Sequence, residues 1–129
     1  MSSLPIVLIV ENDQATYRLY RRALEAEYQV LVASYDDEVL VLVKDRPLAA
    51  IVLEPGPIGG RGWTLLADLK RQPDFQTSPI IICTAQDERR RGQELGSAAY
   101  LIKPVLPAAL LATVRRLTQS HLRKEAQHE

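Results

Sequence analysis

Short runs of apolar residues, each broken off by polar or turn-forming residues, recur along the chain. The clearest run covers residues 50–53 and is followed at once by Glu54, Pro55 and Gly56. Runs of this length are shorter than most helices and are typical of buried strands. The pattern predicts strands over residues 6–10, 28–33, 48–53, 79–83 and 99–102.

Apolar residues in the first two intervening segments recur at helical spacing. Asp13 is placed to cap a helix that runs to about residue 26. Its predicted buried stripe consists of Ala15, Leu19, Ala23 and Ala26. The segment from Ser34 to Asp37 resembles a capping box and opens a short helix that ends before Pro47.

Three further helices are predicted in the second half of the chain. The helix over residues 63–72 turns Leu65, Leu66 and Leu69 inward. The segment 87–95, ended by Gly96, has almost no apolar stripe, so we expect an exposed and loosely held helix. Pro107 suits the first turn of a last helix. The predicted buried face of that helix is Leu110, Leu111, Val114, Leu117 and Leu122.

Strands that alternate with helices imply right-handed crossovers and a parallel sheet covered on both faces. The pattern therefore predicts an α/β fold, a flavodoxin-like (βα)5 three-layer sandwich with strand order 2-1-3-4-5. We expect one domain over residues 1–129, with a folded core over about 5–123 and a frayed polar tail over 124–129.

The chain of 129 residues carries 16 basic and 16 acidic residues, so its formal net charge is zero. This balance gives no electrostatic reason to expect binding to nucleic acid or to a membrane surface. No apolar run approaches the ~20 residues of a membrane span, and the N-terminus lacks the basic region of a signal peptide. Cys83, the single cysteine, lies in an apolar run and is expected to be a buried core residue. These features indicate a cytoplasmic protein.

Polar residues follow the apolar runs at the points where the predicted strands end. They are Glu11, Asn12, Glu54, Thr84 and Lys103. The carboxyl ends of parallel strands share one edge of the sheet, where ligands and chemistry are found. We therefore expect these side chains to gather in one pocket.

The order and spacing of these residues resemble the receiver domain of bacterial two-component response regulators along essentially the whole chain. Gly62 lies eight residues after Glu54, Thr84-Ala85 follows the fourth strand, and Lys103-Pro104 follows the fifth. The resemblance implies a phosphoacceptor position at Glu54 and an acidic Mg²⁺-binding pair at Glu11 and Asn12. It also implies phosphoryl-binding groups at Thr84 and Lys103, a switch aromatic at Tyr100, and a candidate cis bond at Lys103-Pro104.

Two positions on which the family's chemistry depends differ from the family pattern. Glu54 stands where the family has aspartate, which moves the carboxylate by roughly 1.5 Å. Errors near 1 Å can cost about 10²-fold in a transfer reaction that depends on positioning. Asn12 removes one carboxylate, so Mg²⁺ binding through Glu11, Asn12, Glu54 and the Gly56 carbonyl is predicted to be weak or absent. Pro57 and Ile58 also depart from the usual loop.

These departures predict a non-enzymatic pseudo-receiver that acts through protein–protein contact without phosphorylation. Glu54 and Lys103 are expected to form a permanent ion pair, with the domain held in either an active or an inactive state. The expected partner is a histidine kinase or an output protein, and the expected assembly is a monomer or weak dimer. In the family, the face of the fourth helix, fifth strand and fifth helix contacts partners. Here it carries Arg89, Arg90, Arg91 and Tyr100, with Arg115 and Arg116 as further candidates.

Two alternatives stay open at this point. The first is a conventional receiver that is still phosphorylated, with Asp13 as a substitute acceptor. The second is a flavodoxin-like nucleotide-binding protein. The glycine-rich loop over residues 56–62 lacks the Gly-Lys-Ser/Thr of a P-loop, which speaks against the second alternative.

Overall fold

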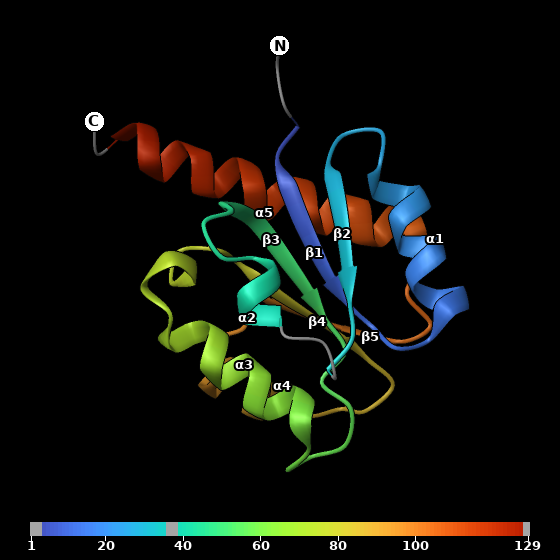
Figure 1. Ribbon diagram of the computed structural model, residues 1–129. Helices are drawn as coiled ribbons and strands as arrows, with labels where there is room; N and C mark the ends of the chain where they lie inside the picture. The colour runs from blue at the N-terminus through green and yellow to red at the C-terminus, as the bar shows by residue number, and fades with distance from the viewer. Residues whose placement is uncertain (1–3, 36–38, 128–129) are drawn as a thin grey trace.

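The computed structural model describes residues 4–35 and 39–127, with side chains described through residue 119. Five parallel strands form one sheet in the order β2-β1-β3-β4-β5, which confirms the predicted topology (Figure 1). The strands are β1 (Ile6–Val10), β2 (Gln29–Ala33), β3 (Leu48–Leu53), β4 (Ile80–Thr84) and β5 (Ala99–Ile102). The helices are α1 (Gln14–Leu24), α2 (Val39–Leu42), α3 (Arg61–Arg71), α4 (Arg89–Glu94) and α5 (Pro107–Gln127), with a 3₁₀ turn at Pro73–Phe75.

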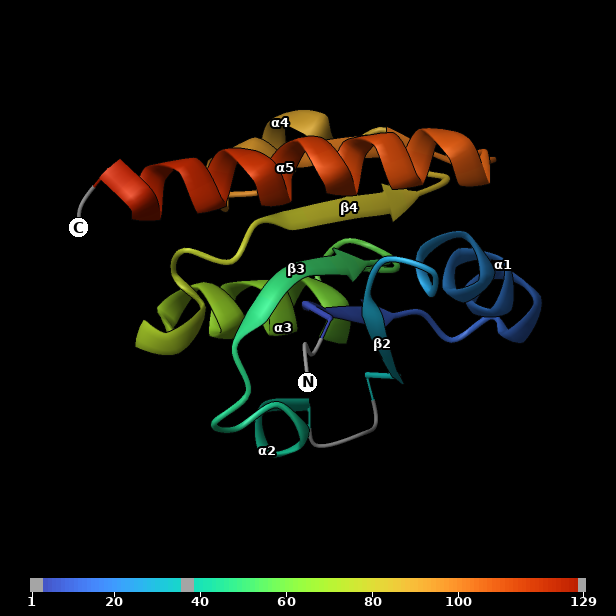
Figure 2. The same cartoon turned by 90° about the horizontal axis from the view of Figure 1, so that it is seen from above.

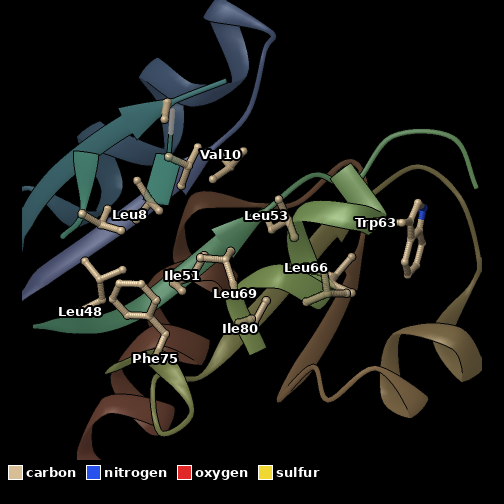
Figure 3. Packing of buried hydrophobic residues seen from close by; sticks show 14 residues of the cluster. Leu8, Val10, Leu48, Ile51, Leu53, Trp63, Leu66, Leu69, Phe75 and Ile80 are labelled. Carbon is tan, nitrogen blue, oxygen red and sulfur yellow. The ribbon is translucent and has the colours of Figure 1, made fainter. Parts of the chain in front are cut away.

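Two hydrophobic clusters lie on opposite faces of the sheet, because successive side chains of a strand point to opposite sides. Val7 and Ile9 of β1 pack in the cluster that contains Leu110 and Val114 of α5. The other cluster joins residues of β1 and β3 to α2 and α3, and Figure 3 shows Leu8, Val10, Ile51, Leu66 and Leu69 among its members. The molecule is thus a three-layer sandwich, with α2 and α5 on opposite sides in Figure 2.

The inward face of α1 differs from the prediction. Ala15, Leu19 and Ala26 are exposed, whereas Tyr20 and Leu24 are the buried residues of this helix. Tyr20 is only 2% exposed and joins the cluster beneath α1 and α5. Burying a tyrosine ring and a leucine removes more apolar surface from water than burying alanines would. Three of the four residues of the predicted stripe therefore lie on the outside of the molecule, and Ala23 is half-buried.

Several helix boundaries also differ from the prediction. Helix α3 begins two residues early, and α4 is shorter than predicted, as it begins only at Arg89. Helix α5 continues to Gln127, within the predicted polar tail, while the fraying of that tail stays a prediction. Asp37 of the proposed capping box lies outside the described residues. Gly96 ends α4 with a positive φ of 94°, as its role in a C-terminal cap predicts. No described helix is long and apolar enough to cross a bilayer.

The loop from β3 to α3 makes an unusually close backbone approach at Gly62. A Cβ atom placed on Gly62 would lie 2.0 Å from the Pro55 carbonyl oxygen and 2.5 Å from its Cα. No side chain fits there, because the obstacle is backbone rather than the end of a flexible side chain. Gly62 therefore lets the first turn of α3 pack against the segment that carries Glu54.

Gly62→Ala is expected to destabilise the domain by about 1–3 kcal/mol or more, because the added methyl group overpacks a backbone contact. The matched control is Gly59→Ala in the same loop, where the added Cβ meets nothing within 4 Å. Gly59 has a φ of 80°, a left-handed conformation that is strained for alanine. The control should therefore lose only ~1 kcal/mol of stability. Urea unfolding of both variants measures the difference. Equal losses would show that the contact with Pro55 is not tight.

Candidate functional site

The backbone places three charged side chains at the carboxyl edge of the sheet. The amide of Glu11 donates to the Ala33 carbonyl at 3.1 Å, and the amide of Glu54 donates to the Val10 carbonyl at 3.0 Å. The amide of Lys103 donates to the Thr84 carbonyl at 2.8 Å. These bonds continue the strand ladders one residue beyond β1, β3 and β5. The three side chains therefore start from backbone that is hydrogen-bonded to a neighbouring strand.

The Lys103 ammonium bridges the two glutamates. Its Nζ lies 2.6 Å from Oε1 of Glu11 and 3.0 Å from Oε1 of Glu54. The side chains of Glu11, Glu54 and Lys103 are 5%, 16% and 22% exposed. The other oxygen of each carboxylate accepts a backbone N–H, from Asp13 at 3.3 Å and from Gly56 at 3.1 Å. The ion pair predicted between Glu54 and Lys103 is present, and Glu11 makes the shorter contact that the sequence did not predict.

The pKa of Lys103 is raised above its usual 10.5. Desolvation by itself lowers this pKa, but hydrogen bonds and Coulombic attraction from Glu11 and Glu54 outweigh it. Lysine therefore stays charged at neutral pH. Because the folded-state pKa is the higher one, the stabilisation is fully present below pH 10.5 and is lost as pH rises through the folded value.

Two aromatic residues hold the loop after β3, and sequence reasoning missed both. The Tyr35 hydroxyl, which follows β2, donates to the Glu54 carbonyl, and the Trp63 indole N–H donates to the Gly56 carbonyl at 3.1 Å. Burial is the main cause that raises the pKa of Tyr35, so its hydroxyl stays a donor. The sequence signal for these contacts was position, because Tyr35 follows a predicted strand and Trp63 begins a predicted helix.

Thr84 is the last residue of β4, and Tyr100 lies within β5. Thr84 is buried at the end of β4, and its Oγ1 accepts the Gln86 amide at 3.4 Å. The Tyr100 hydroxyl donates to the Gln86 carbonyl at 2.7 Å and accepts the Glu88 amide at 3.0 Å. A Cβ on Gly92 of α4 would lie 2.9 Å from the Tyr100 ring. Tyr100 thus ties β5 to the loop that leads into α4, while its role as a switch stays a prediction.

Asn12 and Asp13 follow Glu11 in the segment after β1. Asn12 is exposed. Asp13 caps α1, because its carboxylate accepts the Thr16 amide at 3.0 Å and the Thr16 hydroxyl. These hydrogen bonds lower the pKa of Asp13. Asp13 is therefore engaged as a helix cap, as the sequence predicts.

The residues of this pocket do not fit a magnesium ion in their present arrangement. Lys103 bridges the carboxylates of Glu11 and Glu54, and Trp63 engages the Gly56 carbonyl. Across the described part of the chain, no group of three or more His, Cys, Asp or Glu residues could hold a metal. A cation of this kind prefers several free carboxylate or carbonyl oxygens, so binding here would require the ammonium to move away.

The predicted interface residues on α4 are exposed. Arg89 pairs with Asp87 at 3.0 Å, whereas Arg90 and Arg91 form no ion pair with any described residue. Arg115 does not join them, because it pairs with Glu27 in the turn that follows α1. Of the predicted interface arginines on α4, Arg90 and Arg91 are therefore the ones available to contact a partner protein.

Comparison with known proteins assigns this architecture. The family described as the response regulator receiver domain matches residues 7–115. The chain is 32% identical over 120 residues to the response regulator PleD of Caulobacter vibrioides, covering 90% of this chain but only 26% of that relative. A putative response regulator from Chloroflexus aurantiacus superposes with a TM-score of 0.80 at 27% identity, covering 91% of this chain and 99% of that one.

A second solved structure has the same fold. It is the receiver domain of a sensor histidine kinase from Pseudomonas aeruginosa, with a magnesium ion coordinated in its active-site cleft. It superposes with a TM-score of 0.76 at 21% identity and covers 91% of this chain and 99% of that one. At 21% identity, this similarity shows only that the two chains share a fold.

Lys103→Met is expected to destabilise the domain by about 1–3 kcal/mol at neutral pH, because it leaves two poorly exposed carboxylates without their cation. Urea unfolding measures the loss. The matched control is Lys44→Met, since Lys44 is exposed and forms no ion pair with a described residue. The difference in stability between the two variants should shrink as the pH rises above 10.5. The control still carries Lys103, and its ammonium then deprotonates. A loss no larger than that of the control would show that Lys103 contributes nothing.

Proposed function

Because the chain belongs to the response regulator receiver domain family, we propose that it is a two-component signalling domain that works without phosphorylation of its acceptor position. Receiver domains are generally signalling domains rather than enzymes. The observation that supports the proposal is Glu54, which stands at the acceptor position and contacts Lys103 at 3.0 Å. The partners, a histidine kinase or an output protein, and the cytoplasmic location are parts of the same proposal.

Glu54 is poorly suited to accept a phosphoryl group. One of its oxygens contacts the Lys103 ammonium, and the other accepts the Gly56 amide at 3.1 Å. In-line transfer depends on a positioned nucleophile and on a metal that neutralises the developing charge. Here Glu11, Glu54 and the Gly56 carbonyl, which would hold the metal, already have partners. Weak or absent Mg²⁺ binding is therefore part of the proposal.

The ion pair suggests a pocket held in one state. A phosphoryl group adds about two charges and three acceptor oxygens. Glu54 supplies one charge and reaches Lys103 directly, so the cation has a permanent partner without any modification. The pocket would then give the same signal regardless of a kinase, and other partners would control the output. Whether that state corresponds to an active or an inactive receiver depends on which partner recognises it.

The rival acceptor, Asp13, is held in another role. Its carboxylate accepts two hydrogen bonds from Thr16 and caps α1. Phosphorylation there would have to compete with these two hydrogen bonds, and a cap of this kind is worth about 1 kcal/mol. We therefore favour the phosphorylation-independent proposal over a conventional receiver that uses Asp13.

Treatment of the wild-type protein with a small-molecule phosphodonor and Mg²⁺ is expected to leave its intact mass unchanged. The Asn12→Asp/Glu54→Asp double variant restores the carboxylate count and the shorter acceptor, and it should gain one phosphoryl group. A gain by the wild type would refute the proposal, and peptide mapping would then distinguish Glu54 from Asp13. Failure of the double variant alone would point to the loop after β3 as a further obstacle.

The exposed arginines of α4 are expected to contact an acidic partner. Arg90→Glu/Arg91→Glu should abolish capture of that partner from the native organism, and raised salt should weaken capture by the wild type. The matched control is Lys44→Glu/Arg46→Glu, which reverses two exposed charges near α2. Capture should not depend on phosphodonor. If the α4 variant retains every partner that the control retains, the assignment of this face is wrong.

A further inference from the structure

Helix α2 exposes apolar side chains on its outer side. Val39 and Val43 pack in the cluster beneath this helix and are buried, whereas Val41 and Leu42 are 65% and 38% exposed. A surface helix ordinarily carries polar residues on its outer side, so packing of the core does not explain Val41 and Leu42. Figure 2 shows α2 at the edge of the molecule, apart from α1, α4 and α5.

A shallow depression follows these apolar residues along the chain. Its volume is about 340 Å³, and it is lined by Asp45, Arg46, Pro47 and Asp74. The backbone stays coiled from α2 into this depression. The Lys44 amide donates to the Val41 carbonyl at 3.2 Å, and the Arg46 amide donates to the Val43 carbonyl at 3.0 Å. The projecting residues and the depression are therefore neighbours. We call them together the α2 surface, which consists of Val41, Leu42, Asp45, Arg46, Pro47 and Asp74.

The α2 surface carries charges of both signs. Asp45 and Arg46 are adjacent in the chain, and Asp74 reaches the same depression from the 3₁₀ turn before β4. All three residues are exposed, and none of them forms an ion pair with a described residue. Their charges are therefore available to another molecule.

This mixture of charges favours a partner whose surface carries the same mixture. An anionic membrane, a nucleic acid or an acidic protein would meet Asp45 and Asp74, and a basic protein would meet Arg46. A two-fold symmetric contact between copies of one chain requires a surface that is complementary to itself. The α2 surface meets this requirement in two ways. It places apolar side chains beside a depression, and it places an arginine beside two aspartates.

We propose that the α2 surface joins two copies of this chain in a weak, two-fold symmetric dimer. Val41 of each copy enters the depression of the other, and Arg46 of each copy pairs with Asp74 of the other. This patch is small compared with the ~1,200–2,000 Å² that stable interfaces bury, so the dimer is transient.

The dimer leaves the surfaces of the proposed function free. Pro47 directly precedes β3, so the depression lies at the amino edge of the sheet, whereas Lys103 lies at the carboxyl edge. Helix α4 contacts β5 at the end of the strand order, whereas α2 packs in the cluster that contains residues of β1 and β3. The inference therefore goes beyond the proposed function and does not depend on it.

Sedimentation velocity measures the association from about 10 µM to about 1 mM protein, the range in which weak contacts form and dissociate. The wild type should change from monomer to dimer as its concentration rises. Amide shifts of ¹⁵N-labelled protein should then concentrate on residues 41–47 and 73–75. Val41→Ser should weaken association roughly tenfold or more, as loss of an interface anchor does. The matched control is Leu106→Ser, which removes a similarly exposed apolar side chain after β5 and should associate as the wild type does.

An exchange of charges tests the ion pair between the two copies. Arg46→Asp and Asp74→Arg each place like charges opposite one another, so each should weaken association about tenfold or more. The double variant Arg46→Asp/Asp74→Arg restores opposite charges and should associate as the wild type does. The matched control is Arg22→Asp, which reverses an exposed charge on α1 and should leave association unchanged. A weak dimer dissociates in dilute solution, so substitution of Lys44 or Arg46 does not alter capture through α4.

The positions changed in these variants are exposed, so we expect every variant to fold, and far-UV circular dichroism checks this. A wild type that stays monomeric at the highest concentration would overturn the proposal. Equal losses in Val41→Ser and Leu106→Ser, or amide shifts centred on α1, α4 or α5, would overturn it as well. A double charge variant that associates no better than the single variants would contradict the pairing of Arg46 with Asp74.

Discussion

The pocket of this domain depends on the contact of one ammonium group with two carboxylates. Lys103 bridges Glu11 and Glu54 at 2.6 Å and 3.0 Å, at an edge where three parallel strands end. Each of these residues is held by a backbone hydrogen bond to the neighbouring strand, so the contact depends on strand order rather than on loop flexibility. Both carboxylates contact the same ammonium, so a metal or phosphoryl group would have to displace an existing partner.

The surfaces around this pocket are held by contacts of a different kind. Tyr35 and Trp63 hold the backbone on either side of Pro55, and Tyr100 holds the loop between Thr84 and α4. These are hydrogen bonds from side-chain hydroxyl and indole groups to backbone atoms, which fix loops without any change of charge. A domain built this way can present constant surfaces for binding. The receiver fold supplies the frame, and the proposed output comes from what α4 exposes.

Much of the fold was predictable because apolar runs and turn residues encode strands locally. The predicted bounds of β1, β3 and β5 agree with the structure, and so does the strand order. The phase of α1 was not predictable from spacing alone, since the alanine stripe with Leu19 and the stripe through Tyr20 and Leu24 both have helical periodicity. Only burial against α5 decides between them. Likewise, the sequence pointed to Glu54 with Lys103, but the reach of Lys103 to Glu11 depends on side-chain geometry across the sheet.

The central claim, that Lys103 is the resident cation of the pocket, can be tested by direct observation of its ammonium group. An NMR spectrum that detects lysine ¹⁵Nζ–¹H₃ groups should show one protected signal that is missing in Lys103→Met. The account predicts that this signal keeps its position as MgCl₂ is added at neutral pH, since both carboxylates stay on the ammonium. A signal that shifts or disappears as Mg²⁺ binds would contradict it, because the pocket would then be a metal site from which lysine is displaced.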